Sequence, residues 1–240
     1  MYIRRDIGNL LNILAEPVNV YRKLRERPAW LAAVCSLIVF WLILGGLRIP
    51  AMEAAVRNIF VRAYSEESAE IAGRAAMRFI RLQVYVLEPA GVIANWFAAS
   101  TVLFIAVRMR PRGGAFGFSH ACSLAAYSQA PYVWMEILNT VILYYRGFDA
   151  LRSSADLRPL RGIDYFITSD SLSPIVKDIC SEINPFSVWY VILLGTGIFI
   201  IAGISARDGG AIAGAVWLSR IALRCFIPLV EQLMAGFLLS

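Results

Sequence analysis

Long uncharged runs of apolar residues constrain the fold of this chain more than any other feature. Ala29–Leu47 and Pro89–Val107 each contain 19 residues without a charged side chain. A helix of that length rises about 28 Å, close to the hydrocarbon thickness of a bilayer, about 30 Å. Phe118–Tyr145 and Phe186–Ala206 are apolar over similar or greater lengths. The sequence therefore predicts an all-α, polytopic membrane protein.

The composition indicates the same class. The chain of 240 residues is 59% hydrophobic and 17% charged, whereas soluble domains average about 45–50% apolar and about 25% charged residues. Nearly all the bases are arginines, a codon bias that hints at a GC-rich bacterial genome. The bases are scattered at the ends of apolar runs, which argues against nucleic-acid binding and favours contact with membrane lipids.

We expect five membrane-spanning helices that form a transmembrane bundle. Their expected bounds are about 29–48, 89–107, 119–145, 186–206 and 211–239. The fourth begins at the helix-starting pair Asn184-Pro185, with Trp189 and Tyr190 at the membrane interface. The last contains charges and a proline and follows a tight turn at 207–210. A re-entrant or interfacial helix is therefore the alternative to a full span there.

The regions outside these spans are expected to be amphipathic. Residues 1–28 form a cytoplasmic N-terminal segment of short interfacial helices separated at Glu16-Pro17, with a solvated tail as the alternative. Residues 29–240 form the membrane domain. Its external loops are 49–88, mostly one amphipathic helix, and 146–185, which is polar and contains one short helix. No cleavable signal peptide is expected.

Three arginines predict the orientation in the membrane. Arg108, Arg110 and Arg112 lie in one short loop that contains no acid. Such loops stay in the cytoplasm, where these side chains would contact lipid headgroups. Five spans then place the N-terminus in the cytoplasm and the C-terminus outside a bacterial inner membrane.

A set of polar residues inside the apolar runs is the candidate functional cluster. Charged side chains are costly inside a membrane and usually have a partner or a function. Glu136 is therefore expected to pair with an arginine of the last helix, either as glue between helices or in a polar transport path. The last-helix residues lie within about 40° of arc on one stripe. The cluster comprises Glu136, Asn139, Arg220, Arg224 and Glu231.

No catalytic motif is present. HExxH, GxSxG and glycine-rich phosphate loops do not occur in the sequence. A single histidine, His120, and scattered cysteines predict neither a zinc site nor a disulfide framework. His120 begins a span, so a capping or surface role is expected. Glycines at 195, 197, 203, 210 and 214 are expected to form close-packing surfaces. We therefore predict no enzyme activity and no cofactor.

Two short stretches carry a family resemblance. Ala125–Pro131, AAYSQAP, places Tyr127 and Pro131 in an apolar run, and Asn184–Trp189, NPFSVW, places Trp189 at the entry to the next. They resemble the A-Y-x-x-x-P stretch and the span entry of the Yip-one-domain family, whose founding members bind Ypt/Rab GTPases. Glu16-Pro17-Val18 resembles the N-terminus of the bacterial branch.

The resemblance implies a helical membrane protein without known catalysis. The D-L-Y-G-P stretch of eukaryotic members has no clear counterpart, the nearest being Leu87–Gly91, which argues against a GTPase partner. We therefore expect a non-catalytic inner-membrane scaffold or accessory subunit with other membrane-protein subunits and lipids as partners. The alternative is a small transporter or lipid-handling protein that uses the buried Glu/Arg cluster.

Overall fold

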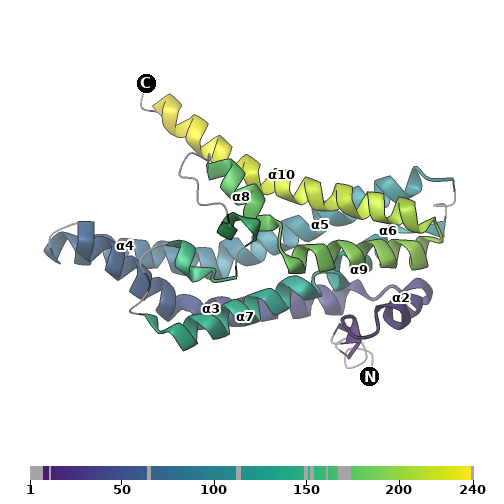
Figure 1. Cartoon of the computed structure of the whole chain (residues 1–240), viewed down its shortest axis with the longest axis horizontal. Helices are drawn as coiled ribbons and strands as arrows, with labels where there is room; N and C mark the ends of the chain where they lie inside the picture. The colour runs from purple at the N-terminus through teal and green to yellow at the C-terminus, as the bar shows by residue number, and fades with distance from the viewer. Residues whose placement is uncertain are drawn as a thin grey trace. The chain divides into compact units, whose positions relative to one another are not determined.

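All regular elements in the described part of the chain are helical (Figure 1). The computed structural model describes residues 8–10, 12–63, 66–111, 115–148, 151, 154–160, 162–166 and 174–238. The elements are α2 (Pro17–Glu26), α3 (Trp30–Ala63), α4 (Glu66–Leu82), the π-helix η1 (Gln83–Leu87), α5 (Glu88–Arg108), α6 (Phe118–Tyr127), α7 (Ala130–Arg146), the 3-10 helices η4 (Ser154–Leu157) and η5 (Ile163–Phe166), α8 (Pro174–Glu182), α9 (Pro185–Ala202) and α10 (Ala206–Leu238).

The chain forms two compact units. Unit 1 contains Met1–Ala33, Asn95–Pro131 and Arg161–Ser240, and unit 2 contains Val34–Ala94 and Tyr132–Leu160. Three helical stretches in the described residues are long and apolar enough to cross a membrane: Trp30–Asn58, Gly73–Arg108 and Pro185–Ala202. These correspond to the first, second and fourth predicted spans. The count of five spans stays a prediction.

The predicted third span is two helices rather than one. Helix α6 ends at Tyr127, a turn follows at Ser128 and Gln129, and α7 begins at Ala130. Pro131 has no N–H group to continue the ladder of α6, but it suits the first turn of a new helix. Ser128 and Gln129 instead donate backbone hydrogen bonds to Leu124 and Ala126, at 3.1 Å each. The proline therefore marks a helix start inside the apolar run.

Helix α3 extends well beyond its predicted end. We expected the span to end near Arg48, yet the helix continues through Pro50 to Ala63. A proline within a helix removes one hydrogen bond and produces a kink without necessarily ending the helix. The single amphipathic helix expected after residue 50 is therefore the end of α3 followed by the separate helix α4 and η1.

Helix α9 begins and ends with the expected kinds of capping residue. The Asn184 side chain accepts hydrogen bonds from the backbone N–H groups of Phe186 and Ser187, both at 3.0 Å. Gly203 ends the helix with φ of +66°, a left-handed conformation that glycine adopts without steric cost. The N-cap prediction is confirmed, and the helix is shorter than the predicted 186–206.

The turn predicted at 207–210 lies elsewhere. Helix α10 already begins at Ala206, and the connection from α9 is residues 203–205. Ser205 caps the new helix, because its hydroxyl accepts a hydrogen bond from the N–H of Asp208 at 3.1 Å. The backbone of α10 is continuous to Leu238. Whether it spans the membrane stays a prediction.

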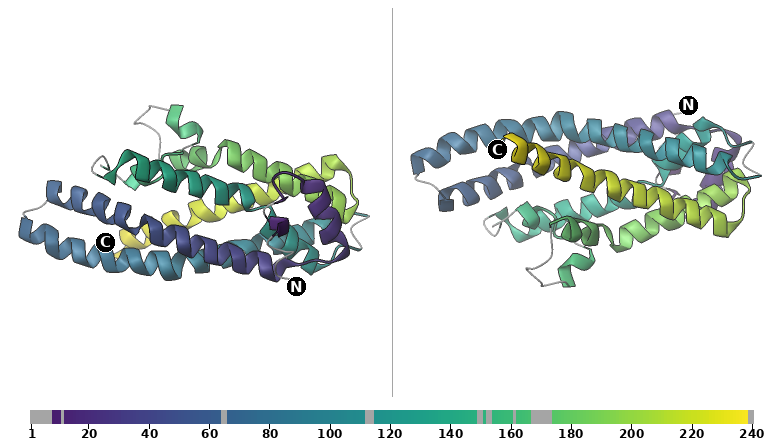
Figure 2. Two further views of the ribbon diagram at one scale, coloured as in Figure 1. Left: turned by 90° about the horizontal axis from the view of Figure 1, so that it is seen from below. Right: turned by 90° about the horizontal axis from the view of Figure 1, so that it is seen from above.

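Unit 1 is organised around α9, which packs against α2, α6 and α10. Helices α9 and α10 run side by side as an antiparallel pair (Figure 2). A Cβ atom at Gly197 would lie only 2.9 Å from Cζ of Tyr21, and one at Gly195 would lie 3.4 Å from Cα of Gly210. The close-packing prediction is confirmed at Gly195 and Gly197. Gly210 supplies the α10 side of the contact with Gly195, so the prediction also holds there. A Cβ atom at 203 or 214 would meet no atom within 4 Å, so the prediction is wrong at these two positions.

Unit 2 has a smaller core between α3 and α7. Ala51, Ala55, Leu143 and Leu151 are buried together. The Tyr144 hydroxyl donates a hydrogen bond of 2.7 Å to the Leu47 carbonyl. These contacts fix α7 against the middle of α3, where Arg48 of α3 and Glu136 of α7 form the charged site of unit 2.

Candidate functional site

The candidate site of unit 2 is an ion pair between α3 and α7. Arg48 Nη1 lies 2.5 Å from Glu136 Oε2, and the two side chains are only 9% and 5% exposed. Arg48 was predicted only to end a span, whereas Glu136 was predicted to pair with Arg220 or Arg224. In the structure the partner of Glu136 is Arg48. The predicted pairing of Glu136 with an arginine of the last helix stays a prediction that the structure does not support.

A short loop segment closes over this ion pair. Arg48 Nη2 donates a 2.6 Å hydrogen bond to the Leu157 carbonyl. Asn139, one turn beyond Glu136 on α7, accepts a hydrogen bond from the N–H of Leu160 at 2.8 Å. Side chains of two helices therefore bond to backbone groups at the end of η4 and in the residues that follow it. We call residues 157–160 the strap.

A second carboxylate lies beside the pair. Glu88 begins α5 directly after the π-helix Gln83–Leu87. Its electrostatic neighbours are Arg48, Arg158 and Glu136, and it also lies close to Gly45 of α3. Two carboxylates and two guanidinium groups thus balance in charge. A π-helix shifts the register of a helix by one residue and is frequent at functional sites, and here it precedes the carboxylate that joins the site.

The site retains unused hydrogen-bond donors. Arg48 Nε and Asn139 Nδ2 are buried and have no hydrogen-bond partner among the described residues. Both side chains hold the strap, so these N–H groups belong to one neighbourhood. Buried polar atoms are nearly always paired, frequently with an ordered water molecule. The arrangement therefore favours an acceptor, such as water, within the cluster.

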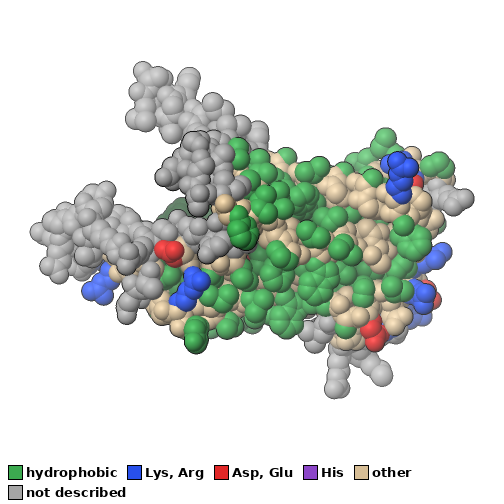
Figure 3. Space-filling view, in the orientation of Figure 1, with side chains coloured by type: hydrophobic (Ala, Val, Ile, Leu, Met, Phe, Trp, Pro, Cys, Tyr) green, Lys and Arg blue, Asp and Glu red, His purple; other side chains and the backbone are tan. Residues whose placement is uncertain are grey.

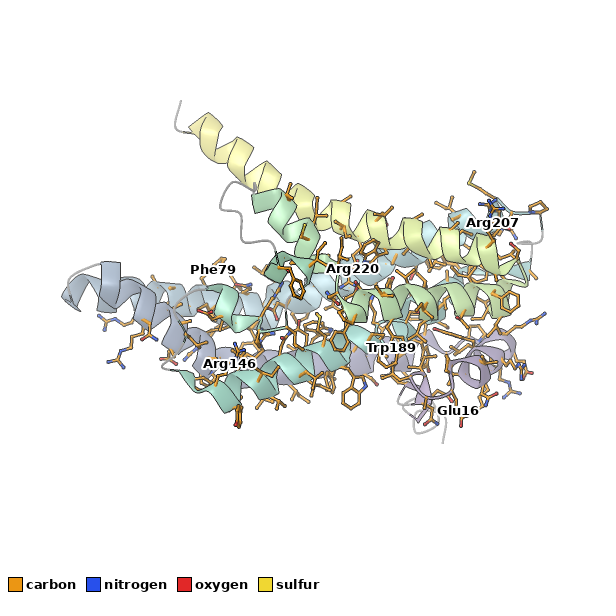
Figure 4. All side chains as sticks on the ribbon, viewed as in Figure 1. Glu16, Phe79, Arg146, Trp189, Arg207 and Arg220 are labelled. Atoms are coloured by element: carbon orange, nitrogen blue, oxygen red, sulfur yellow. The ribbon has the colours of Figure 1, made fainter. Side chains whose placement is uncertain are left out.

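Arg220 is in a separate polar site, within unit 1. Its Nη1 lies 3.2 Å from Gln129 Oε1, and its guanidinium group lies 5.8 Å from the ring centroid of Tyr190. Figure 4 shows Arg220 in the middle of α10. Gln129 follows the C-terminus of α6, where the helix dipole is negative and a cation is favourable. The broken helix thus supplies an amide oxygen and a dipole to a buried arginine.

The remaining predicted residues divide by exposure. Tyr127 and Pro131 are buried in unit 1, and Trp189 is exposed on α9. Tyr190 is fully buried, so its prediction as an interface residue is wrong; its ring packs within the core beside Arg220. Arg108 and Arg110 are exposed, and Arg110 pairs with Asp208 at 3.2 Å. The side chains of Arg112, Arg224 and Glu231 lie outside the described residues.

His120 has the predicted capping role. Its Nδ1 accepts a hydrogen bond of 3.2 Å from the N–H of Gly117, which precedes α6. Its Nε2 lies 3.1 Å from the Arg25 carbonyl. A neutral imidazole with the proton on Nε2 satisfies both contacts. His120 therefore joins the start of α6 to the end of α2.

Within the described chain no group of three His, Cys, Asp or Glu side chains could hold a metal ion. The buried charges instead pair with other protein groups. The sequence did not predict Arg48 and Glu88 as members of the site, because Arg48 follows an uncharged run and was expected only to end a span, and Glu88 precedes one and was expected only to suit a helix N-terminus. Arg48 directly follows the first predicted span and Glu88 directly precedes the second. These matching positions were the signal that the sequence offered.

Comparison with known proteins gives one match. The family model described as the Yip1 domain matches residues 11–224, which include both charged sites and the Tyr127, Pro131 and Trp189 positions. No curated protein and no solved structure matches the chain significantly.

Proposed function

Since this chain belongs to the Yip1-domain family of membrane proteins, we propose that it acts as a non-catalytic scaffold or accessory subunit of a membrane complex. Its place would be the bacterial inner membrane, with the N-terminus in the cytoplasm. The observation that carries the proposal is the buried pair of Arg48 and Glu136. Its atoms are bonded to one another and to the strap, so they hold helices together rather than presenting a reactive group.

The outer surface supports a role in assembly. Helix α7 presents a row of exposed side chains at spacings of four, three and four residues: Trp134, Leu138, Val141 and Tyr145. Such spacing forms one face of a helix. Figure 3 shows hydrophobic side chains over much of the visible face. In a membrane, the exposed apolar face of α7 would contact lipid tails or the helices of a neighbouring subunit.

Co-purification from native membranes tests the scaffold function. We expect a mild detergent to extract the chain with other membrane proteins in stoichiometric amounts. Alanine at Trp134 and Val141 should reduce that recovery, whereas alanine at Leu218 of α10, an exposed residue of unit 1, serves as the control. Recovery of the chain alone, both in detergent and in native lipid discs, would contradict the proposal.

The second candidate function is transport or lipid handling through the charged site of unit 2. The observation in its favour is the pair of unused donors on Arg48 and Asn139. In a cysteine-free background, Asn139→Cys should react with a small water-soluble thiol reagent if water fills the site. If the site is dry, the residue stays unlabelled and the scaffold function gains. A cysteine at the exposed Arg158 is the positive control.

A further inference from the structure

One end of unit 1 collects basic side chains from three segments. They are Arg22, Lys23 and Arg25 of α2, Arg108 and Arg110 at the end of α5, and Arg207 at the start of α10. All six are exposed, and we call this set the basic end. The described acids in and beside these segments are Glu16, Glu26 and Asp208, and Arg27 directly after α2 is a further exposed base, so bases outnumber acids seven to three.

Side-chain contacts bring these segments together. His120 at the start of α6 lies 3.1 Å from the Arg25 carbonyl. Phe118, two residues earlier, stacks edge-on against Phe104 in the last turn of α5, with ring centroids 5.7 Å apart. Arg110 pairs with Asp208 of α10. Figure 4 labels Arg207 at this end of α10.

Helix α2 cannot anchor itself by inserting into the bilayer. Val20, Tyr21 and Leu24 are at most 1% exposed and pack on α9 and α6, whereas Val18, in the first turn, is the one large apolar side chain of α2 that is exposed, at 40%. A membrane-surface helix needs that apolar face to enter the acyl boundary. The protein therefore already covers the apolar face of α2 and holds its basic face outward.

The basic end coincides with the ends of the apolar helices. Helix α5 ends at Arg108, and α9 ends only a few residues before Arg207. Because α9 is long and apolar enough to cross a membrane, we expect its end at the depth where lipid phosphates lie. Clustered bases at that level attract anionic lipids.

We propose that the basic end binds the phosphate headgroups of anionic lipids and that α2 is a protein-held part of this site. The argument for lipid over an acidic protein segment is the depth of the site. Arg108 and Arg110 directly follow a span and meet headgroups first, whereas a cytoplasmic protein would approach from beyond them. The proposal is independent of the scaffold function.

Nanodiscs of defined composition test this proposal. The full chain is placed in discs of phosphatidylcholine, with or without a minority of phosphatidylglycerol, and its melting is followed by tryptophan fluorescence. We expect the anionic lipid to raise the melting temperature by several degrees, because a ligand that binds only the folded state stabilises it. The shift should shrink as salt rises from about 0.1 M to about 1 M, since the Debye length falls from about 10 Å to about 3 Å.

Matched variants locate the effect. The quadruple variant Arg22→Gln, Lys23→Gln, Arg25→Gln and Arg207→Gln should lose most of the shift. The control removes four exposed arginines of unit 2, through Arg57→Gln, Arg78→Gln, Arg81→Gln and Arg146→Gln, and should keep it. Both variants have the same net charge, so a loss in both would overturn the proposal.

Three further outcomes decide the matter. An equal melting temperature in both disc types overturns the proposal. An equal shift on adding inorganic phosphate to neutral discs assigns the site to a free anion and also overturns it. If the quadruple variant keeps its lipid response but no longer recovers proteins from native membranes, the surface binds an acidic protein instead. A quadruple variant that melts normally in neutral discs shows that folding is intact.

Discussion

At the scale of single residues, Gly197 is the α9 glycine at which an added Cβ atom would come closest to its neighbours. A Cβ atom there would lie 2.9 Å from Cζ of Tyr21 and closer still to Leu124. We predict that Gly197→Ala destabilises the protein by about 1–3 kcal/mol, because overpacking forces neighbouring side chains or backbone to move. The melting temperature in detergent measures the effect.

Gly214 provides the matched control for this substitution. It is a helical glycine of α10, and a Cβ atom added there would meet no other atom within 4 Å. Alanine at this position should be neutral or stabilising by about 0.5–1 kcal/mol, because alanine loses less conformational freedom in a helix. Equal effects at the two glycines would refute the close-packing explanation.

Tyr21 links the stability of unit 1 to alkaline pH. Burial raises the pKa of its hydroxyl well above the ordinary value, although a hydrogen bond with Ser128 opposes the change. In the unfolded chain the hydroxyl ionises near pH 10. Stability from the neutral buried form is therefore complete below about pH 10 and is lost above it, by about 1.4 kcal/mol per pH unit.

Tyr21→Phe tests this linkage. The variant cannot ionise at this position, so its melting temperature should fall less steeply above about pH 10 than that of the unsubstituted protein. Below about pH 9 it should be less stable by about 1 kcal/mol, the typical contribution of a hydrogen bond. Tyr145→Phe, at a residue that is 93% exposed, should leave the pH dependence unchanged. If the melting temperatures of Tyr21→Phe and of the unsubstituted protein fell in parallel above about pH 10, Tyr21 would be excluded as the cause of the alkaline loss of stability.

At the scale of elements, long uncharged runs predicted α3, α5 and α9 because length and composition alone decide whether a helix can cross a bilayer. The helix ends were harder to predict. Pro50 lies inside α3, whereas Pro131 starts α7, and both are prolines in apolar surroundings. Each proline lies close to a tertiary contact that the sequence does not reveal: Arg48 pairs with Glu136 of α7, and Gln129 bonds to Arg220 of α10.

The partner of Glu136 could not be predicted for the same reason. A buried carboxylate requires a cation, but the sequence contains several arginines in or beside apolar runs. Arg48 is separated from Glu136 by 88 positions, and only the packing of α3 on α7 selects it. The requirement for a pair followed from the sequence, whereas the choice of arginine depended on the fold.

The ion pair between α3 and α7 predicts coupled mutational effects. Glu136→Gln should destabilise the protein by about 3–5 kcal/mol, because it leaves the Arg48 charge buried without its partner. Arg48→Met should cost a similar amount. The double variant should be more stable than the sum of both losses implies. The melting temperature of each variant in one detergent gives the double-mutant cycle.

Arg220→Gln is the control for this cycle. Arg220 contacts Gln129 and Tyr190 within unit 1, so the effect of its substitution should simply add to that of Glu136→Gln within about 0.5 kcal/mol. Strong coupling of Glu136 to Arg220, with none to Arg48, would instead restore the pairing predicted from the sequence.

At the scale of the whole molecule, contacts within unit 1 constrain the topology. His120 contacts Arg25, and Arg110 pairs with Asp208. These contacts bring the end of α2, the connection after α5 and the start of α10 to one end of the unit. Helix α9 leads from Asn184 to that end and is long enough to cross a membrane. Residues before Asn184 are therefore expected on the opposite side of the bilayer.

Fusions to alkaline phosphatase test this topology, because the enzyme needs disulfides that form only outside the cytoplasm. Arginine-rich short loops remain in the cytoplasm, so we predict inactive fusions after residue 112 and after Asp208. A fusion near Asp164 should be active. Activity at all three positions, or the reverse pattern, would contradict the orientation. If the fusions near Asp164 and after Asp208 were both active, with the fusion after residue 112 inactive, α9 would not cross the membrane, and the pair of Arg110 with Asp208 could not form in the bilayer.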